Sequence, residues 1–550
     1  MFDLIDLDHL TDPAQVKEGL RLLLNLLEEL KQDNVALRKE LQRLRDELNR
    51  LKGEQAKPDI KANKSKDKSD HSSEKERKTH KKARNSSKKK DKIKIDRTEV
   101  VRLDKSALPE DAVFKGYQEV VVQDIKLTTD NVLFRKEKYY SPSQGKSYLA
   151  ALPAGYVGAY GPGVKALSII FYYVGNMTQP KILDLMGNIG LLLSSAQLSR
   201  WLSSDQADFE AERDGLFRAG LASSPWQQID ETAMRVSGEN RHTHIVCNPL
   251  YTYYKTTRKK DRLAVIEVLR GSDERLFCLN DEAMLYLEGV GLSRIKRAVL
   301  SDWVSDEPLS ESEFSALVSQ VPLGVQQRKW VFDAGAIAAY HAQQDITVVH
   351  SLLCDDAPQF KGITEQLSLC WVHDGRHYKK LVPYVSYHAK LVDDFLKQYW
   401  HYYGQLLAYK AAPMESERGR LSEEFDRLFS HQTGYDALDD RIAKTRAKKA
   451  FLLLVLAHPE LPLHNNDAEL GARLRVRKRK VSVTTRSESG TVAWDTYMSL
   501  AATTKKLGIS FYRYVFDRIM GRNQVPSLAE IITERADQMQ LGASWDIQTS

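Results

Sequence analysis

Leucine recurs at alternating steps of three and four positions along the first fifty residues, the spacing of one apolar stripe on a helix. With Leu20 in heptad position a, leucine fills the d positions from Leu23 to Leu51 and Asn34 is the one polar residue at a, as in parallel two-stranded coiled coils. A single amphipathic surface helix is the alternative. Opposite charges at the g and e′ positions favour pairing: Asp33–Arg38, Glu40–Arg45 and Glu47–Lys52. The pattern predicts a coiled-coil helix in residues 1–52 that pairs two chains through 16–52.

The next patterned segments predict a small β unit and then a helical unit. Residues 112–153, within a unit 98–155, are rich in β-branched and aromatic residues interrupted by turn signals, which favours antiparallel strands. Residues 156–222 predict helices, one capped by Thr178 and another capped by Ser194 or Ser195, with Gly187 between them. Two short helices across a glycine turn suit a DNA-binding helix-turn-helix, and they also suit an ordinary helical bundle.

Three segments of the second half end or begin in acidic residues. The strand-like run from Trp226 reaches Asp230, and two further alternating runs follow it. An apolar run that begins at Ile346, of the buried-strand type, ends in Asp355 and Asp356. A helix predicted to open at Asn465 carries Glu469 in its first turn. Helices are also expected over about 380–460 and in the C-terminal segment 501–550.

Composition and charge narrow the possible classes of protein. A chain of 550 residues is expected to form several domains, and no apolar run approaches the roughly 18 residues needed to span a membrane. The acidic N-terminus does not resemble a signal peptide, and the four cysteines lack CxxC spacing, so a cytoplasmic protein with reduced thiols is expected.

Positive charge is concentrated in one linker. Residues 53–97 hold 17 Lys or Arg against 8 Asp or Glu, while the whole chain carries a net charge of +7. The near absence of apolar residues predicts a disordered basic linker, which is either a plain solvated spacer or a nonspecific DNA tether. A basic-zipper transcription factor is excluded, because its basic region precedes the zipper, whereas here it follows and is broken by Gly53 and Pro58.

The acidic positions suggest metal-dependent phosphoryl chemistry. Mg²⁺ prefers oxygen ligands and is commonly held by carboxylates, and two such ions can activate an attacking oxygen and stabilise a leaving one. Each position also has an ordinary explanation, since acids are common at strand ends and Glu469 with Arg473 could be a surface ion pair.

From about Tyr156 to Met520 the chain resembles the insertion-sequence-66 family of bacterial transposases. The motifs that carry the resemblance are Asp230-Glu-Thr, Asp355 with Phe360 five residues on, Cys370-Trp-Val-His373 with Arg376, Asn465-Asn466-x-Ala468-Glu469-x-x-x-Arg473, and Arg477-Lys-Arg-Lys480 followed by Arg486-Ser-Glu-Ser-Gly490. Their order and spacing fit the family.

The resemblance implies a DDE transposase with a ribonuclease-H-like catalytic domain over 223–500. Asp230, Asp355 and Glu469 are then the catalytic metal ligands for two Mg²⁺ ions, which Mn²⁺ could replace. Asp356 competes for the second position, but the aromatic spacing favours Asp355, and adjacent strand residues face opposite ways. Phosphate or other DNA contacts are implied for six basic residues: His373, Arg376, Arg473, Arg477, Lys478 and Lys480. A structural histidine and a solvated helix face are the alternatives for these positions.

Two features depart from the family. Members usually carry a small zinc unit before the helix-turn-helix, but here Ser141 and Gln144 stand where cysteines are expected, so no zinc is predicted. Residues about 265–345 form a longer insertion than expected, predicted to be mostly helical.

The resulting prediction is a multidomain α+β protein: an N-terminal parallel coiled coil, a disordered basic linker, a small β unit, a helix-turn-helix-like domain and a ribonuclease-H-like α/β catalytic domain with helical insertions. It would bind the terminal repeats of an insertion sequence and target DNA as a homodimer or higher oligomer, with or without accessory proteins, near the bacterial nucleoid. A non-catalytic DNA-binding regulator and a nuclease that cuts without joining are the alternatives.

Overall fold

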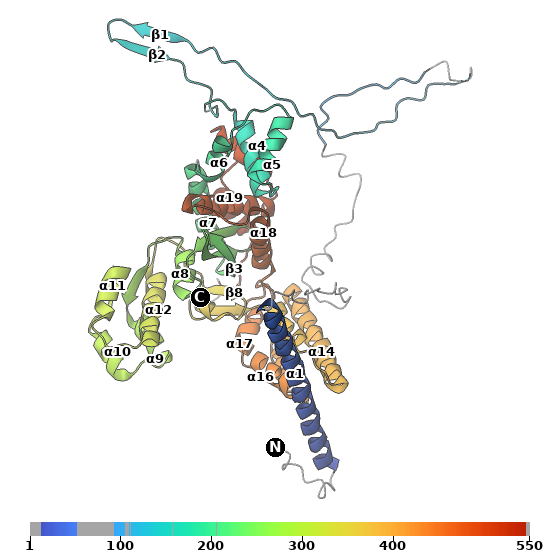
Figure 1. Ribbon diagram of the computed structural model, residues 1–550, viewed down its shortest axis with the longest axis vertical. Coiled ribbons are helices and arrows are strands. Elements are labelled where there is room, and N and C mark those ends of the chain that lie inside the picture. Colours follow the sequence, from blue (N-terminus) through green and yellow to red (C-terminus); the bar gives the residue numbers. More distant parts are fainter. Residues whose placement is uncertain are drawn as a thin grey trace.

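The computed structural model describes residues 13–51, 93–104, 109, 112–156, 158–204 and 206–545. It is a mixed α+β protein, 55% helical, built around a central mixed sheet (Figure 1). Most of the basic linker predicted over 53–97 lies outside the described residues, so its predicted disorder remains a prediction. Among the helices of the described part, none is long and apolar enough to cross a membrane.

The central sheet has five strands in the order β5-β4-β3-β8-β9. The first three in sequence are antiparallel neighbours, and β8 and β9 then add parallel to β3. The predicted strands are confirmed, although only Ser351–Cys354 of the run that begins at Ile346 form a strand. The bounds are β3 (Trp226–Val236), β4 (Glu239–Cys247), β5 (Thr252–Thr257), β8 (Ser351–Cys354) and β9 (Gln366–Leu369).

Helix α19 (Glu488–Lys506) covers the free edge of β5. The backbone N–H groups of alternate β5 residues donate to its side chains: Thr252 to Thr503, Tyr254 to Ser499, and Thr256 to Asp495, at 2.7–3.1 Å. These side chains recur every four residues on the helix, so one helix face matches the two-residue repeat of the strand. An edge that would otherwise be open to pairing with another chain is thereby closed.

Opposite faces of the sheet receive different helices. Helix α18 (Asn466–Ser482) packs on the face of the sheet toward which the Gln228 side chain points. Gln228 Oε1 accepts a hydrogen bond from the Asp467 N–H at 3.2 Å. The neighbouring Gln227 points to the other face and donates to the carbonyls of Gly220 and Leu221 in α7 (Ala207–Ala222). Alternation of side chains along β3 therefore separates the two helical layers.

The helical unit over 156–222 contains α4 (Pro162–Tyr173), α5 (Gln179–Asn188), α6 (Ser195–Ser203) and α7. Thr178 is the N-cap of α5, and Ser194 caps α6 by accepting a hydrogen bond from the Gln197 N–H, so the predicted helix starts are confirmed. The predicted break at Gly187 is wrong: Gly187 lies within α5, and the chain turns after the helix, where Gly190 has a φ of 85°. The C-terminal segment returns to this unit through α20 (Phe511–Ile519) and α21 (Leu528–Met539), which contact α4 and α7.

The insertion between β5 and β8 is mostly helical, as predicted, but it also holds a two-stranded sheet that the sequence pattern did not indicate. Arg262 anchors it by pairing with Asp333 at 2.5 Å and donating to the Lys361 carbonyl at 3.0 Å. Its elements are α8 (Arg262–Arg270), β6 (Leu276–Leu279), α9 (Asp281–Gly289), α10 (Arg294–Ser301), β7 (Ser305–Ser310), α11 (Glu311–Val318) and α12 (Val325–Ala342).

A second helical region follows β9, as predicted for about 380–460. Its elements are α13 (Trp371–Lys379), α14 (Ser386–Ala411), α15 (Glu415–Phe429), α16 (Asp436–Arg446) and α17 (Lys449–Leu452). Figure 1 shows the long N-terminal helix α1 (Pro13–Leu51) lying beside α14 and α16. The helix predicted from the leucine repeat is confirmed.

The antiparallel unit predicted from residues 112–153 is wrong in its extent. One hairpin forms there, β1 (Lys138–Ser141) with β2 (Lys146–Leu149), and residues 113–137 contain no strand. The run Val120–Val122 is exposed and has no core to pack against. Strand propensity largely reflects packing on a half-buried sheet, so these β-branched residues alone do not make one.

We expect loss of the Asp495 carboxylate to destabilise the central sheet and its helices strongly. Asp495 pairs with Arg475 of α18, a fully buried guanidinium, at 2.7 Å, and breaking a buried pair from one side typically costs about 3–5 kcal/mol. Asp495→Ala should therefore lower the thermal unfolding temperature clearly, whereas Asp302→Ala, at an exposed site, should not. Equal unfolding temperatures for the two variants would contradict this account.

Candidate active site

Asp230 and Asp355 lie at the same level on adjacent parallel strands. The paired register of β3 and β8 ends at Gln228 opposite Leu353, and each aspartate is two residues further along its own chain. Residues in register on parallel neighbours point to the same face, so both carboxylates emerge on one side of the sheet. The structure therefore brings together two of the three predicted catalytic residues.

Close packing of α18 brings the third carboxylate to this face. Ile245 of β4 is the partner of Asp230 in the sheet, and a Cβ added to Gly471 would lie 2.8 Å from the Ile245 side chain. Glycine at this position therefore lets the helix approach the strand directly beside Asp230. Asn465, just before the helix, donates to the Ile229 carbonyl at 2.7 Å and fixes where the helix begins. Glu469, in the first turn, is thus held beside Asp230 of β3 and near the end of β8.

The adjacent acids Asp355 and Asp356 have different surroundings. Asp355 accepts a hydrogen bond from the Ala357 N–H at 3.2 Å and lies within electrostatic reach of Asp230. Asp356 forms ion pairs with Lys448 at 2.5 Å and Lys361 at 2.9 Å. Burial alone would raise the pKa of Asp356, but the two lysines hold it below its ordinary value. The preference for Asp355 over Asp356 is consistent with this arrangement.

Asp230 is the electrostatic centre of the cluster. Burial raises its pKa to about 7. A hydrogen bond from the Glu231 N–H, at 2.8 Å, opposes that rise, whereas the negative charges of Asp355 and Glu469 add to it. A bound cation would relieve the repulsion of a partly buried carboxylate that lies beside other carboxylates.

Glu469 is engaged by two arginines. Arg376 of α13 donates to both of its oxygens at 3.1 Å, and Arg473, one turn along α18, donates to Oε2 at 3.3 Å. Within the described residues, no three His, Cys, Asp or Glu side chains converge at metal-ligand distances. The three acids are therefore neighbours of suitable donor chemistry, and Glu469 would have to turn from its arginines to join the two aspartates around an ion.

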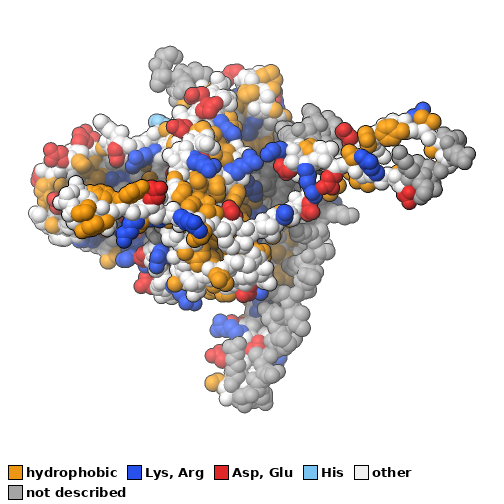
Figure 2. All heavy atoms as spheres, turned by 90° about the horizontal axis from the view of Figure 1, so that it is seen from above, with side chains coloured by type: hydrophobic (Ala, Val, Ile, Leu, Met, Phe, Trp, Pro, Cys, Tyr) orange, Lys and Arg blue, Asp and Glu red, His pale blue; other side chains and the backbone are white. Residues whose placement is uncertain are grey.

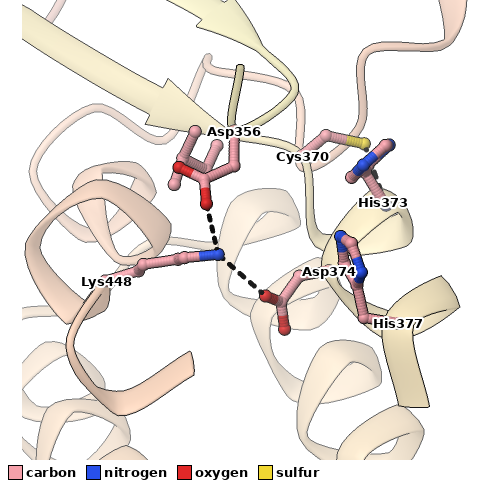
Figure 3. A pocket seen from close by; sticks show the side chains of 7 residues that line it. Asp356, Cys370, His373, Asp374, His377 and Lys448 are labelled. Atoms are coloured by element: carbon pink, nitrogen blue, oxygen red, sulfur yellow. Dashed lines mark hydrogen bonds and ion pairs between the residues drawn. The ribbon is translucent and has the colours of Figure 1, made fainter. Parts of the chain in front are cut away.

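Helix α13 carries His373 beside this cluster. Burial lowers the pKa of His373, and the charges of Asp355 and Glu469 partly counter that effect. The histidine lines a small pocket together with Cys370, Asp374 and His377 (Figure 3). Lys448 reaches into the same pocket and lies between Asp356 and Asp374 (Figure 3).

One face of α18 combines Glu469 with exposed basic residues. Arg473, Arg477 and Lys480 follow Glu469 at helical spacing and are exposed. The prediction that Lys478 contacts DNA is not supported, because this residue faces the opposite way and is fully buried. Its ammonium donates to the Tyr172 carbonyl at 2.5 Å and lies 3.2 Å from the centre of the Tyr172 ring. Burial lowers its pKa to about 7.

Several residues at the site carried no recognisable signal in the sequence. Two lysines pair with Asp356: Lys361 lies only five residues after it, whereas Lys448 comes from a turn far from it in the chain. Lys260 pairs with Glu231, next to Asp230, at 3.1 Å. Lysines are common on every surface, and only the tertiary fold shows which of them face an acid.

The fold and the site together define a mixed α+β protein with an acidic cluster where the parallel pairing of β3 with β8 ends. No known family model matches the chain. A curated protein of Sinorhizobium fredii, named uncharacterized protein y4jO, is 33% identical over 330 residues, which are 58% of this chain and all of that protein. The chain belongs to the same family as y4jO. That name states no activity, so it adds no functional assignment.

The raised pKa of Asp230 predicts a pH-dependent gain of stability in Asp230→Asn. Because the folded-state pKa of about 7 exceeds the ordinary value of 3.8, the folded chain binds this proton more tightly than the unfolded chain. The stability that the folded chain gains from this tighter proton binding is therefore lost as pH rises from about 4 to about 7. The substituted amide cannot ionise, so in chelator the variant should unfold at a higher temperature than the parent at pH 8, by up to about 4 kcal/mol in stability.

The gain should shrink as pH is lowered toward 4, where Asp230 is neutral in both states. Asp302→Asn, at an exposed position, should show no such trend. A constant difference from pH 4 to pH 8, or a less stable Asp230→Asn at pH 8, would contradict the assigned electrostatics.

Proposed function

We propose that this chain is a DNA transposase of the DDE type, related to the insertion-sequence-66 family. The observation that carries the proposal is the placement of Asp230 and Asp355 at one level on adjacent parallel strands, with Glu469 on a helix packed beside them. Three antiparallel strands followed by two parallel ones, with the first strand bearing an aspartate, support a ribonuclease-H-like catalytic domain.

Asp230, Asp355 and Glu469 would hold two Mg²⁺ ions, or Mn²⁺ in their place, which when bound would neutralise phosphate charge and activate the attacking oxygen. The acids supply oxygen donors of the kind these ions prefer. Water attack would break a P–O bond at the element end and release a 3′-OH. That hydroxyl would then attack a target phosphate, forming one P–O bond as another breaks.

Arginines beside the acids would bind the DNA backbone. A guanidinium can hold a phosphate through two parallel N–H bonds, as Arg376 now holds the Glu469 carboxylate. In the proposed complex Arg376 and Arg473 would release Glu469 and bind phosphate oxygens instead. Arg477 and Lys480 would extend the contact along the exposed face of α18. His373 would orient the backbone next to Asp355.

Other parts of the chain would select and retain the DNA. The short helices α5 and α6 have the size and the separation of a helix-turn-helix. Viewed from the end of the molecule that carries them, Lys and Arg side chains lie among apolar ones across the middle of the surface (Figure 2). Together with the basic linker 53–97, this surface would bind terminal repeats in the cytoplasm, near the nucleoid.

Two other functions remain as alternatives: a regulator that binds DNA without cutting it, and a nuclease that cuts without joining. The experiment that separates them uses labelled duplexes from the sequences flanking the gene, with Mg²⁺ and a plasmid target. Strand-transfer products support a transposase, cutting alone supports a nuclease, and binding alone supports a regulator.

We expect Asp230→Asn and Asp355→Asn to lose about a thousandfold or more of the Mg²⁺-dependent cleavage, because each removes a charge at the reacting centre. DNA binding, measured by fluorescence anisotropy, should be nearly unchanged. Asp356→Asn is the matched control, since its carboxylate is paired with lysines, and it should cost only about 10- to 100-fold. Unimpaired cleavage by Asp230→Asn would refute the assignment, as would a greater loss from Asp356→Asn than from Asp355→Asn.

A further inference from the structure

Helix α1 contacts the rest of the chain through the side opposite its leucine stripe. With Leu20 in position a, the contacting residues Arg21, Asn25 and Glu28 occupy positions b, f and b. These positions lie on the outer face of a two-stranded coiled coil. The face that touches the body is therefore distinct from the face that the heptad pattern assigns to pairing.

Glu28 is the strongest of these contacts. It is 2% exposed, and its carboxylate accepts from the backbone N–H groups of Tyr384 at 2.7 Å and Val385 at 2.8 Å, directly before α14. The Nδ1 atom of His388 lies 3.3 Å away. The first N–H groups of a helix lack partners within it, and an anion is favoured at this end. Glu28 thus holds the two residues that lead into the 26-residue helix α14, about 360 residues away in sequence.

Asn25 makes a second contact of the same kind. Its side-chain amide donates to the Gly434 carbonyl and to the Asp436 carboxylate, both at 3.1 Å, and its oxygen accepts from the Asp436 N–H at 3.4 Å. Asp436 is the first residue of α16. Two residues of α1, one turn apart, therefore hold the starts of two helices of the region that follows β9.

The leucine stripe has no such contacts within the described residues. Every a and d position of α1 is exposed, including Leu30 at 61%, Leu37 at 69% and Leu44 at 55%. Single exposed leucines are normal, but a continuous row along a long helix marks an interaction surface. The full row is Leu20, Leu23, Leu27, Leu30, Leu37, Leu41, Leu44, Leu48 and Leu51.

We propose that α1 has two binding faces: its leucine stripe pairs with that of a second copy of this chain, while its outer face holds the helical region that follows β9 in its own chain, through Glu28 and Asn25. The occupant of the stripe is assigned to a second copy because the residues flanking it are self-complementary. In a parallel pair Asp33 would face Arg38, and Glu40 would face Arg45 of the partner helix. The helical regions of two chains would then be fixed on opposite sides of one coiled coil.

The pairing arm of the test uses the full-length chain and light scattering after gel filtration. We expect the parent chain to be a dimer and Leu37→Glu with Leu44→Glu to be a monomer, because both glutamates enter the stripe. The matched control places the same two glutamates one position earlier, as Ala36→Glu with Arg43→Glu, both exposed and outside the stripe. A monomeric parent chain, or a stripe variant that remains dimeric, would overturn the pairing.

The docking arm uses hydrogen exchange of the amides of Tyr384 and Val385. Glu28→Ala should speed their exchange by roughly tenfold or more, since each loses a bond to a charged acceptor, while the chain stays dimeric. Glu29→Ala, at the neighbouring exposed position, should not. In the monomeric stripe variant these amides should remain protected. If they lost protection there, Glu28 would be supplied by the second copy, and docking within one chain would be refuted.

Discussion

The negative charge gathered where the pairing of β3 with β8 ends is the constraint on which this half of the molecule depends. Asp230, Asp355 and Glu469 approach one another from two strands and a helix, and the pKa of Asp230 is raised by burial and by its two neighbours. The surrounding acids are paired with cations: Lys260 on Glu231, Lys361 and Lys448 on Asp356, and Arg376 with Arg473 on Glu469. Lys361 and Arg473 are close in sequence to the acids they pair with, whereas Lys260, Lys448 and Arg376 come from other segments. The loops and helices around the sheet therefore serve partly to compensate the charge that the strands concentrate.

Helix α18 connects this site to the rest of the fold through two faces. Its exposed face carries Glu469 and the basic residues that follow it. Its buried face carries Arg475, paired with Asp495 of α19, and Lys478, enclosed by aromatic rings of α4 and α19. Because the same helix packs on the sheet at Gly471, its position is fixed on three sides. A carboxylate that must meet two others within a few ångströms requires such a fixed support.

Much of this arrangement could be predicted from the sequence where a period or a cap was clear. The leucine repeat predicted α1, Thr178 and Ser194 marked helix starts, and the apolar runs ending in acids located β3 and β8. Proximity of Asp230, Asp355 and Glu469 was inferred from motif resemblance, since periodicity alone cannot bring together residues so far apart in the chain.

The failures have physical causes. The β-branched run 120–122 suggested strands, but no sheet is near enough to bury it. Lys478 belongs to a basic run and looked exposed, yet helical rotation turns it inward while Arg477 stays outside. The contact of Glu28 with the rest of the chain could not be predicted from the sequence, because an acid at a b position resembles any solvated heptad residue until its partner amides are known.

The central claim is that Asp230, Asp355 and Glu469 form one metal site. Its most direct test is a crystal structure of the chain with DNA and Mn²⁺, using anomalous scattering to locate the ions. The account predicts anomalous peaks between the two aspartates and Glu469, with Glu469 released from Arg376, and none at Asp356. Peaks confined to Asp356 and Asp374, or no peak near Asp230, would contradict it.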